Sequence, residues 1–183
     1  MNDSQISVRY AKALFKSAIE QDLIDGIYQE MLIILDACKI QEFVYLLETP
    51  AVSGEQKCNI AMEILKGKIS KLTGTLIKLV MSNKREMYLP GIARHYKALY
   101  KKHKGIKSAS LVTAFAIDDK TKENLIQLIK QAMNAEIEMS SEVDETVLGG
   151  FILTIEDQQY DASIATSLKK IKKQLLDTSV IKN

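Results

Sequence analysis

A glycine pair, Gly149-Gly150, is the first feature of this sequence that could do chemistry. A phosphate-binding loop presents backbone N–H groups to the phosphates, and it either continues with Lys-Ser or Lys-Thr or follows a GxGxxG spacing. Here the pair stands between Leu148 and Phe151, and neither arrangement is present. The spacing therefore favours a bulge or a close backbone approach at a strand over a nucleotide site.

Residues that could bind a metal or transfer protons are dispersed. His95 and His103 have neither a carboxylate at the HExxH position nor a nearby cysteine. Acidic pairs such as Asp118-Asp119 fit a helix cap better than an acid–base couple. We therefore predict no catalytic residue, no metal site and no cofactor, although an enzyme with a widely dispersed site stays an alternative.

The segment from Lys97 to Lys107 is basic and follows or includes two tyrosines, Tyr96 and Tyr100. Such a mixture can track a nucleic-acid backbone while its aromatic rings stack on bases. More often it is a solvated helix end whose lysines complement the helix dipole. A basic RNA-binding module is therefore the alternative function.

Composition indicates an ordinary globular protein. The 183 residues are 46% hydrophobic and 26% charged, and the net charge of +2 creates no strong field for a polyanion. Cys38 and Cys58 lack CxxC spacing, so we expect buried thiols in a reducing compartment. The amino terminus lacks the pattern of a secretory signal, and no segment reaches the roughly 20 apolar residues of a spanning helix.

The elements that must position any functional residues change character along the chain. Residues 6–103 repeat apolar side chains at helical spacing, with Ser53 and Gln56 able to form a capping box and Pro90 suited to a first turn. This pattern predicts a bundle of about six helices over residues 1–104. The like charge and Gly105 that follow indicate a domain boundary.

Residues 105–183 predict a small mixed domain, so the fold class is α+β. Alternation indicates a strand over 111–117, a second around Ile137 and Met139, a third over 147–155 and a short return strand at Tyr160. A helix capped by Asp118 or Asp119 separates the first two strands. An amphipathic helix over 162–176 ends the domain.

Two helices carry more apolar surface than one bundle core needs. On a helical wheel, the first helix has a second apolar side through Tyr10, Ala13 and Leu14, and the segment 72–81 has the same excess. Side by side, two such helices would form a groove for an amphipathic helix of another protein. Simple burial of both helices is equally compatible with the periodicity.

Three stretches in order resemble one family. Arg9-Tyr10-Ala11-Lys12-Ala13-Leu14-Phe15 is similar to the opening motif of the delta subunit of F-type ATP synthases. Asn83-Lys84-Arg85 with Leu89-Pro90 and Tyr96 resembles its middle. The block from Gly149 to Ile155, with Asp157, Asp161, Ser163-Ile164 and Leu168, resembles its carboxyl-terminal part. One departure is Glu156, which stands where the family usually has a glycine and puts the local turn in doubt.

The resemblance implies a non-catalytic stator component that links the catalytic alpha-beta head to the peripheral stalk formed by the b subunits. It implies that residues 1–104 take the amino-terminal helix of an alpha subunit between their first and fifth helices. By position, the groove residues would be Tyr10, Ala13, Leu14, Leu76, Leu79 and Val80. Residues 105–183 would meet the carboxyl-terminal ends of the b subunits near Gly149 and Gly150. It also implies a bacterial-type complex on the cytoplasmic face of the cell membrane, with no nucleic acid and no small-molecule substrate.

Overall fold

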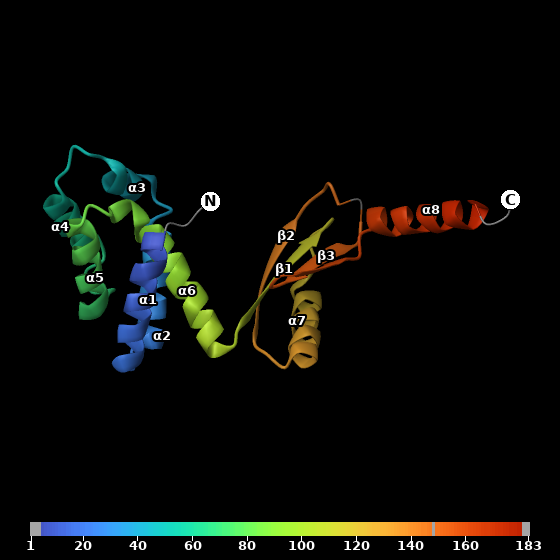
Figure 1. Cartoon of the computed structure of the whole chain (residues 1–183), viewed down its shortest axis with the longest axis horizontal. Helices are drawn as coiled ribbons and strands as arrows, with labels where there is room; N and C mark the ends of the chain where they lie inside the picture. Colours follow the sequence, from blue (N-terminus) through green and yellow to red (C-terminus); the bar gives the residue numbers. More distant parts are fainter. Residues whose placement is uncertain (1–4, 148, 181–183) are drawn as a thin grey trace. The chain divides into compact units, whose positions relative to one another are not determined.

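The computed structural model describes residues 5–147 and 149–180 and divides the chain into two compact units that meet at Lys104 and Gly105 (Figure 1). The first unit is helical. The second is a four-stranded mixed sheet with two helices. The predicted α+β fold class is confirmed.

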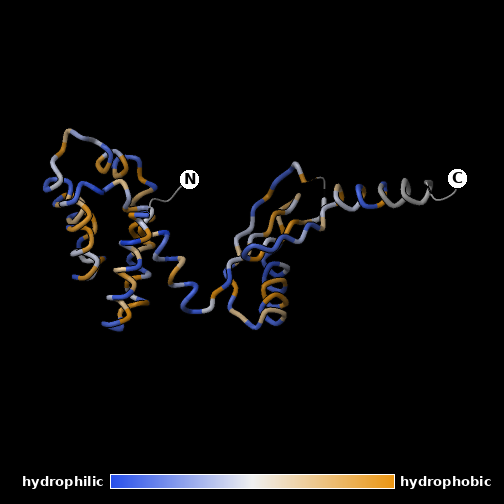
Figure 2. The backbone as a smooth tube through the Cα atoms, viewed as in Figure 1, coloured by the Kyte–Doolittle hydropathy of each residue, from blue (hydrophilic) through white to orange (hydrophobic). Residues whose placement is uncertain are grey.

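Six α-helices and one 3-10 turn make up the described part of the first unit. They are α1 (Gln5–Glu20), α2 (Ile24–Ala37), α3 (Gln41–Glu48), α4 (Gly54–Ile64), α5 (Lys71–Ser82), η1 (Glu86–Tyr88) and α6 (Leu89–Lys104). Ser53 and Gln56 form the predicted capping box of α4, because each side chain bonds the other residue's backbone N–H. Hydrophobic and hydrophilic residues alternate along the bundle helices (Figure 2), as helices with one buried face require.

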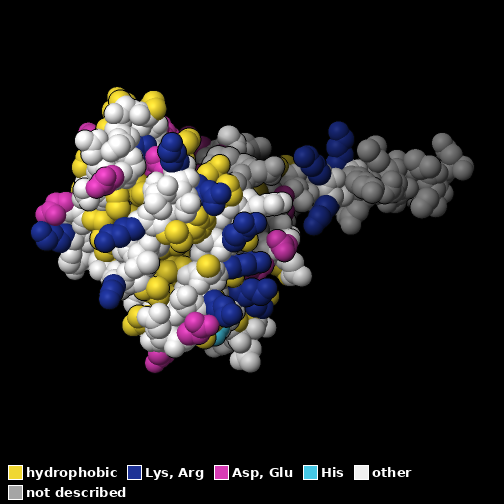
Figure 3. All heavy atoms as spheres, turned by 60° about the vertical axis from the view of Figure 1, so that its left-hand side comes forward, with side chains coloured by type: hydrophobic (Ala, Val, Ile, Leu, Met, Phe, Trp, Pro, Cys, Tyr) yellow, Lys and Arg dark blue, Asp and Glu magenta, His cyan; other side chains and the backbone are white. Residues whose placement is uncertain are grey.

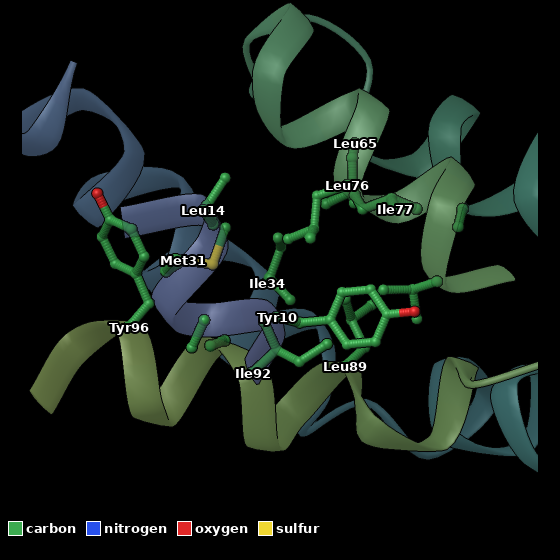
Figure 4. Packing of buried hydrophobic residues seen from close by; sticks show 14 of the residues in the cluster. Tyr10, Leu14, Met31, Ile34, Leu65, Leu76, Ile77, Leu89, Ile92 and Tyr96 are labelled. Atoms are coloured by element: carbon green, nitrogen blue, oxygen red, sulfur yellow. The ribbon is translucent and has the colours of Figure 1, made fainter. Parts of the chain in front are cut away.

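One hydrophobic core joins these helices. Tyr10 and Leu14 from α1 pack into the same cluster as Ile34 from α2 and Ile77 from α5 (Figure 4). Tyr96 of α6 is fully buried, and its hydroxyl donates a hydrogen bond of 3.3 Å to the carbonyl oxygen of Ile24.

A buried ion pair ties α3, α4 and η1 together. Lys57 Nζ lies 2.6 Å from Glu86 Oε1 and donates a second bond of 2.7 Å to the carbonyl oxygen of Leu47. The lysine side chain is 4% exposed. Burial opposes ionisation of Glu86 and is the largest single influence on it. The hydrogen bonds to the carboxylate and the positive charges of Lys57 and Lys84 together outweigh burial, so the pKa of Glu86 lies below its ordinary value.

The last turn of α6 is fastened to α2. Tyr100 stacks on Tyr28 at a centroid distance of 3.9 Å and donates a hydrogen bond of 2.7 Å to Asp25, which also pairs with Lys104 at 2.9 Å. The bond to Asp25 raises the pKa of Tyr100 to about 12. The helix is therefore held up to Lys104, and Gly105 follows with a left-handed φ of 68°.

The second unit orders its strands β2-β1-β3-β4. Its elements are β1 (Lys107–Thr113), α7 (Asp119–Met133), β2 (Ile137–Val143), β3 (Phe151–Ile155), β4 (Gln158–Asp161) and α8 (Ile164–Val180). β1 pairs with β2 in parallel and with β3 antiparallel, which brings Leu111 beside both Ser141 and Leu153. Ile129 of α7 packs on the buried side chains of this sheet.

Several predicted boundaries in this unit were wrong. β1 begins at Lys107 and ends at Thr113, four residues before Ile117, which lies beyond the strand and packs at the core instead. β3 begins at Phe151 rather than at residue 147, because the two preceding glycines adopt positive φ angles that no regular strand contains. Asp118 is the cap of α7, since its side chain accepts a bond from Thr121 N at 3.1 Å.

Candidate partner-binding site

The six predicted groove residues lie on α1 and α5, and the structure divides them into two groups. Four are buried in the bundle core: Tyr10, Leu14, Leu76 and Val80. Ala13 is exposed, and Leu79 is 50% exposed although its neighbour Val80 is 0% exposed. The buried four can form only the floor of a binding face, whereas Ala13 and Leu79 stand at its rim.

Tyr10 fixes how the two helices face each other. Its hydroxyl accepts hydrogen bonds from Arg85 Nη1 at 3.2 Å and from Asn83 Nδ2 at 3.3 Å, and the Arg85 guanidinium lies 5.8 Å from the ring centroid. These contacts join the first and the middle stretch of the family resemblance. The side of α1 that carries Tyr10 therefore faces the side of α5 that ends at Asn83.

Helical spacing extends that contact into two facing apolar stripes. Residues three, four or seven apart share one side of a helix. Ile6 and Ala13 therefore flank Tyr10 on α1, and on α5 the stripe that ends at Asn83 runs through Leu72, Leu76 and Leu79. We call the surface formed by Ile6, Ala13, Leu72 and Leu79 the α1–α5 face. Ile6 and Leu72 are half-buried, so the core and this face share them.

The two helices that carry the α1–α5 face are basic. The bundle surface that comes forward in Figure 3 carries a band of hydrophobic side chains with lysines and arginines beside it. Between them, α1 and α5 hold one acidic residue, Glu20, against five basic ones: Arg9, Lys12, Lys16, Lys71 and Lys78. A helix with acidic flanks would suit two helices of this charge.

The two tyrosines that the RNA-binding alternative depends on are both engaged within the first unit. Tyr96 is fully buried, and Tyr100 is stacked on Tyr28 and bonded to Asp25. Neither ring is available to stack on a base. Residues 97–104 of the basic segment are the end of α6, as the alternative of a helix end predicted, and Lys107 begins a strand.

Gly149 and Gly150 hold the beginning of α8. Gly150 has a φ of 80°, and a Cβ there would overlap the carbonyl oxygen of Ala162. The carbonyl oxygen of Gly149 accepts a bond of 3.0 Å from the N–H of Ile164. Asp161 accepts bonds from Ser163 N at 2.9 Å and from Thr166 Oγ1 at 2.8 Å. The third stretch of the resemblance is therefore a backbone junction, and the predicted close approach is confirmed.

Glu156 keeps the turn that its substitution for glycine put in doubt. Its φ is 51°, in the left-handed region that a glycine would adopt with less strain. Its side chain accepts a hydrogen bond of 2.6 Å from the N–H of Ser108 on β1, which offsets part of that strain.

No group of three or more metal-ligating side chains is found among the described residues. Cys38 and Cys58 are half-buried, so the expectation of fully buried thiols was wrong. Partial burial still raises the pKa of the Cys38 thiol to about 11. Within residues 5–147 and 149–180, no helix combines the length and hydropathy needed to span a bilayer. The described features are thus those of a two-unit α+β protein that presents an apolar helix face.

Known proteins resemble this chain over nearly its whole length. The family model described as "ATP synthase delta (OSCP) subunit" matches residues 6–175. ATP synthase subunit delta of Bacteroides fragilis is 36% identical over 94% of both chains, and that of Amoebophilus asiaticus is 36% identical over 93% of this chain and 94% of the relative. A chain of the Toxoplasma gondii mitochondrial ATP synthase hexamer superposes with a TM-score of 0.77 at 26% identity, covering 94% of this chain and 98% of that one.

The chain therefore belongs to the ATP synthase delta (OSCP) family, the stator components of F-type ATP synthases. It is a subunit within that complex, whose catalysis lies in other subunits.

Proposed function

We propose that this chain is the non-catalytic connector that binds the alpha-beta head through the α1–α5 face and the peripheral stalk through residues 105–183. It would lie at the cytoplasmic face of the cell membrane, where only the other subunits of the complex hold it. The observation that carries the proposal is the α1–α5 face itself. Leu79 and Ala13 are exposed above a floor of buried side chains that Tyr10, Arg85 and Asn83 hold in place.

The occupant that fits this face is an amphipathic helix, for which we propose the amino-terminal helix of an alpha subunit. Apolar residues at helical spacing on that helix would rest between the two stripes. A floor that is already ordered loses little conformational freedom on binding, so more of the contact energy becomes affinity.

The connector role favours apolar contacts over surface ion pairs. A stator that releases the head under torque uncouples rotation from catalysis, so slow dissociation matters most. Exposed ion pairs each contribute only about 0 to 1 kcal/mol. The basic residues of α1 and α5 would then speed encounter with an acidic helix, while Leu79 would hold it.

Reconstitution of the ATP synthase tests the proposal. Heads and membranes stripped of the delta subunit are recombined with the full chain, with the Leu79→Arg variant, or with Ile64→Arg as a control at a similarly exposed position of α4. We expect ATP hydrolysis in every sample, but ATP-driven proton pumping only with the full chain and the control. Equal pumping without the chain, or with Leu79→Arg, would refute the proposed function.

A further inference from the structure

A second apolar surface of the first unit lies on helices that the α1–α5 face does not use. The end of α2 together with α3 and α4 encloses a cavity of about 360 Å³. Sites for small organic ligands span about 300 to 1,000 Å³, so the volume suits a small molecule. We call it the α3–α4 cavity, and its principal lining side chains are Ile40, Glu42, Phe43, Tyr45, Ile60 and Ile64.

The α3–α4 cavity has a buried floor and an exposed rim. Phe43 is 3% exposed and belongs to the bundle core, so the floor is already ordered. Ile40, Ile60 and Ile64 are 54%, 43% and 47% exposed around it. Ile60 and Ile64 are four residues apart and therefore share one side of α4. Large aliphatic side chains gathered in water at one hollow are typical of a binding site, whereas single exposed ones are not.

The cavity carries a negative charge. Among the described residues that line it, only Glu42 has a charged side chain, and no described basic side chain pairs with it. The exposed lysines at the ends of α2 and α4 are already engaged. Lys39 pairs with Asp36 at 2.7 Å, and Lys66 pairs with Glu63 at 3.1 Å. An organic cation would therefore be favoured over an anion beside this hollow.

Glu42 also has a structural role, which does not account for the hollow. It lies in the first turn of α3, where a carboxylate complements the helix dipole. That role requires no apolar cavity beside the carboxylate. Tyr45 adds to the preference for a cation, because its ring is 70% exposed and the face of an aromatic ring attracts positive charge. One carboxylate beside one hollow matches a ligand with one cationic group and one hydrocarbon part.

We propose that the α3–α4 cavity binds a small amphiphilic cation, an alkyl or aryl amine. Its hydrocarbon part packs against Phe43, Ile60 and Ile64. Its ammonium group pairs with Glu42. A neutral molecule of the same shape gains only the apolar contacts, and a carboxylate is repelled. The site is independent of the proposed function, because none of its residues lies on α1 or α5.

Titration of the ¹⁵N-labelled full-length chain with octylammonium, octanol or octanoate tests the proposal. The three probes share an eight-carbon chain and differ in charge, and NMR shift changes give both the site and the Kd. We expect the largest changes over residues 40–46 and 60–64. Octylammonium should bind about three- to tenfold more tightly than octanol, as one exposed ion pair and one cation–π contact allow, and octanoate should not saturate.

Three variants locate the site. Ile64→Arg obstructs the rim and adds a positive charge, so it should abolish octylammonium binding. Leu79→Arg adds the same charge on the α1–α5 face and should leave the Kd unchanged. Glu42→Gln should bring the Kd for octylammonium to that for octanol while the Kd for octanol stays the same. All three positions are exposed, so circular dichroism should show an intact fold.

Several results would overturn the proposal. Equal binding of octylammonium and octanoate would show that charge plays no part. Shift changes centred on α1 and α5, or a Kd that neither Ile64→Arg nor Glu42→Gln alters, would place the ligand elsewhere. No binding of octylammonium, together with saturable binding of a lysine-rich amphipathic peptide at the same residues, would assign the cavity to a protein partner instead.

Discussion

Substitutions at two neighbouring residues of α5 should separate partner binding from stability. Val80 is 0% exposed in the bundle core, whereas Leu79 is 50% exposed on the α1–α5 face. Val80→Ala removes two buried methyl groups, which costs about 1.6 kcal/mol for transfer. The remaining cavity brings the loss to about 2 to 3 kcal/mol. For a unit of this size, that loss lowers the melting temperature by roughly 8 to 24 °C.

Leu79→Ala should have the opposite profile. Because half of the side chain is already in water, its truncation should cost the fold less than about 1 kcal/mol. A buried anchor in an interface is worth about 1 to 3 kcal/mol, so the Kd for a peptide copying the alpha subunit's amino-terminal helix should rise roughly 5- to 150-fold.

Circular dichroism at 222 nm measures the melting of both full-length variants, and titration calorimetry measures peptide binding. Two results would refute the reasoning. An unchanged Kd for Leu79→Ala would place the helix elsewhere, and a melting loss as large as that of Val80→Ala would mean that Leu79 belongs to the core.

Five further outcomes are expected. Glu86→Gln should destabilise the bundle by about 3 to 5 kcal/mol by leaving the Lys57 ammonium unpaired, and Lys57→Met with Glu86→Leu should recover much of it in urea melts. Because the pKa of Glu86 is lowered on folding, its ionised carboxylate adds to the free energy of unfolding in full above its ordinary pKa. That stabilisation is lost as the pH falls through the lowered pKa, so the Glu86→Gln variant should lack this loss in an acid titration. Gly150→Ala should destabilise the second unit by about 1 to 3 kcal/mol, whereas Gly26→Ala in α2, with open space around it, should be neutral or stabilising. Calorimetry should detect no saturable ATP binding at micromolar concentration. A chain ending at Ser163 should still bind the head but no longer bind the stalk, which pull-down assays with each part would check.

Local features of the fold could be predicted from the sequence. The capping box at Ser53, the cap at Asp118 and the helical character of residues 5–104 depend on neighbours within a few positions. Boundaries set by distant contacts could not. The start of β3 depends on how closely Gly150 approaches Ala162 on a returning segment, and spacing alone does not reveal that approach.

The sequence likewise could not predict which of the predicted groove residues are buried and which are exposed. A helical wheel finds two apolar sides on α1 but does not say which one meets the core. That choice depends on the contact between Tyr10 and Arg85, which are 75 positions apart. The excess of apolar surface predicted that α1 serves both the core and an exposed face. Tertiary packing decides that Tyr10 and Leu14 are buried while Ala13 is exposed.

The two proposed binding regions differ in how much order exists before a partner arrives. At the α1–α5 face both walls are packed on one core, so binding adds a helix to a surface that is already in place. At α8 the first turn is fastened, and among the side chains that the structure describes beyond it Leu168 and Ile171 are exposed, so a partner would add contacts to the helix. Binding at α8 should therefore be coupled to helix stabilisation and lose more conformational entropy for each contact made. Under torque, the stalk end of such a connector would yield before the head end unless the rest of the second unit shares the load.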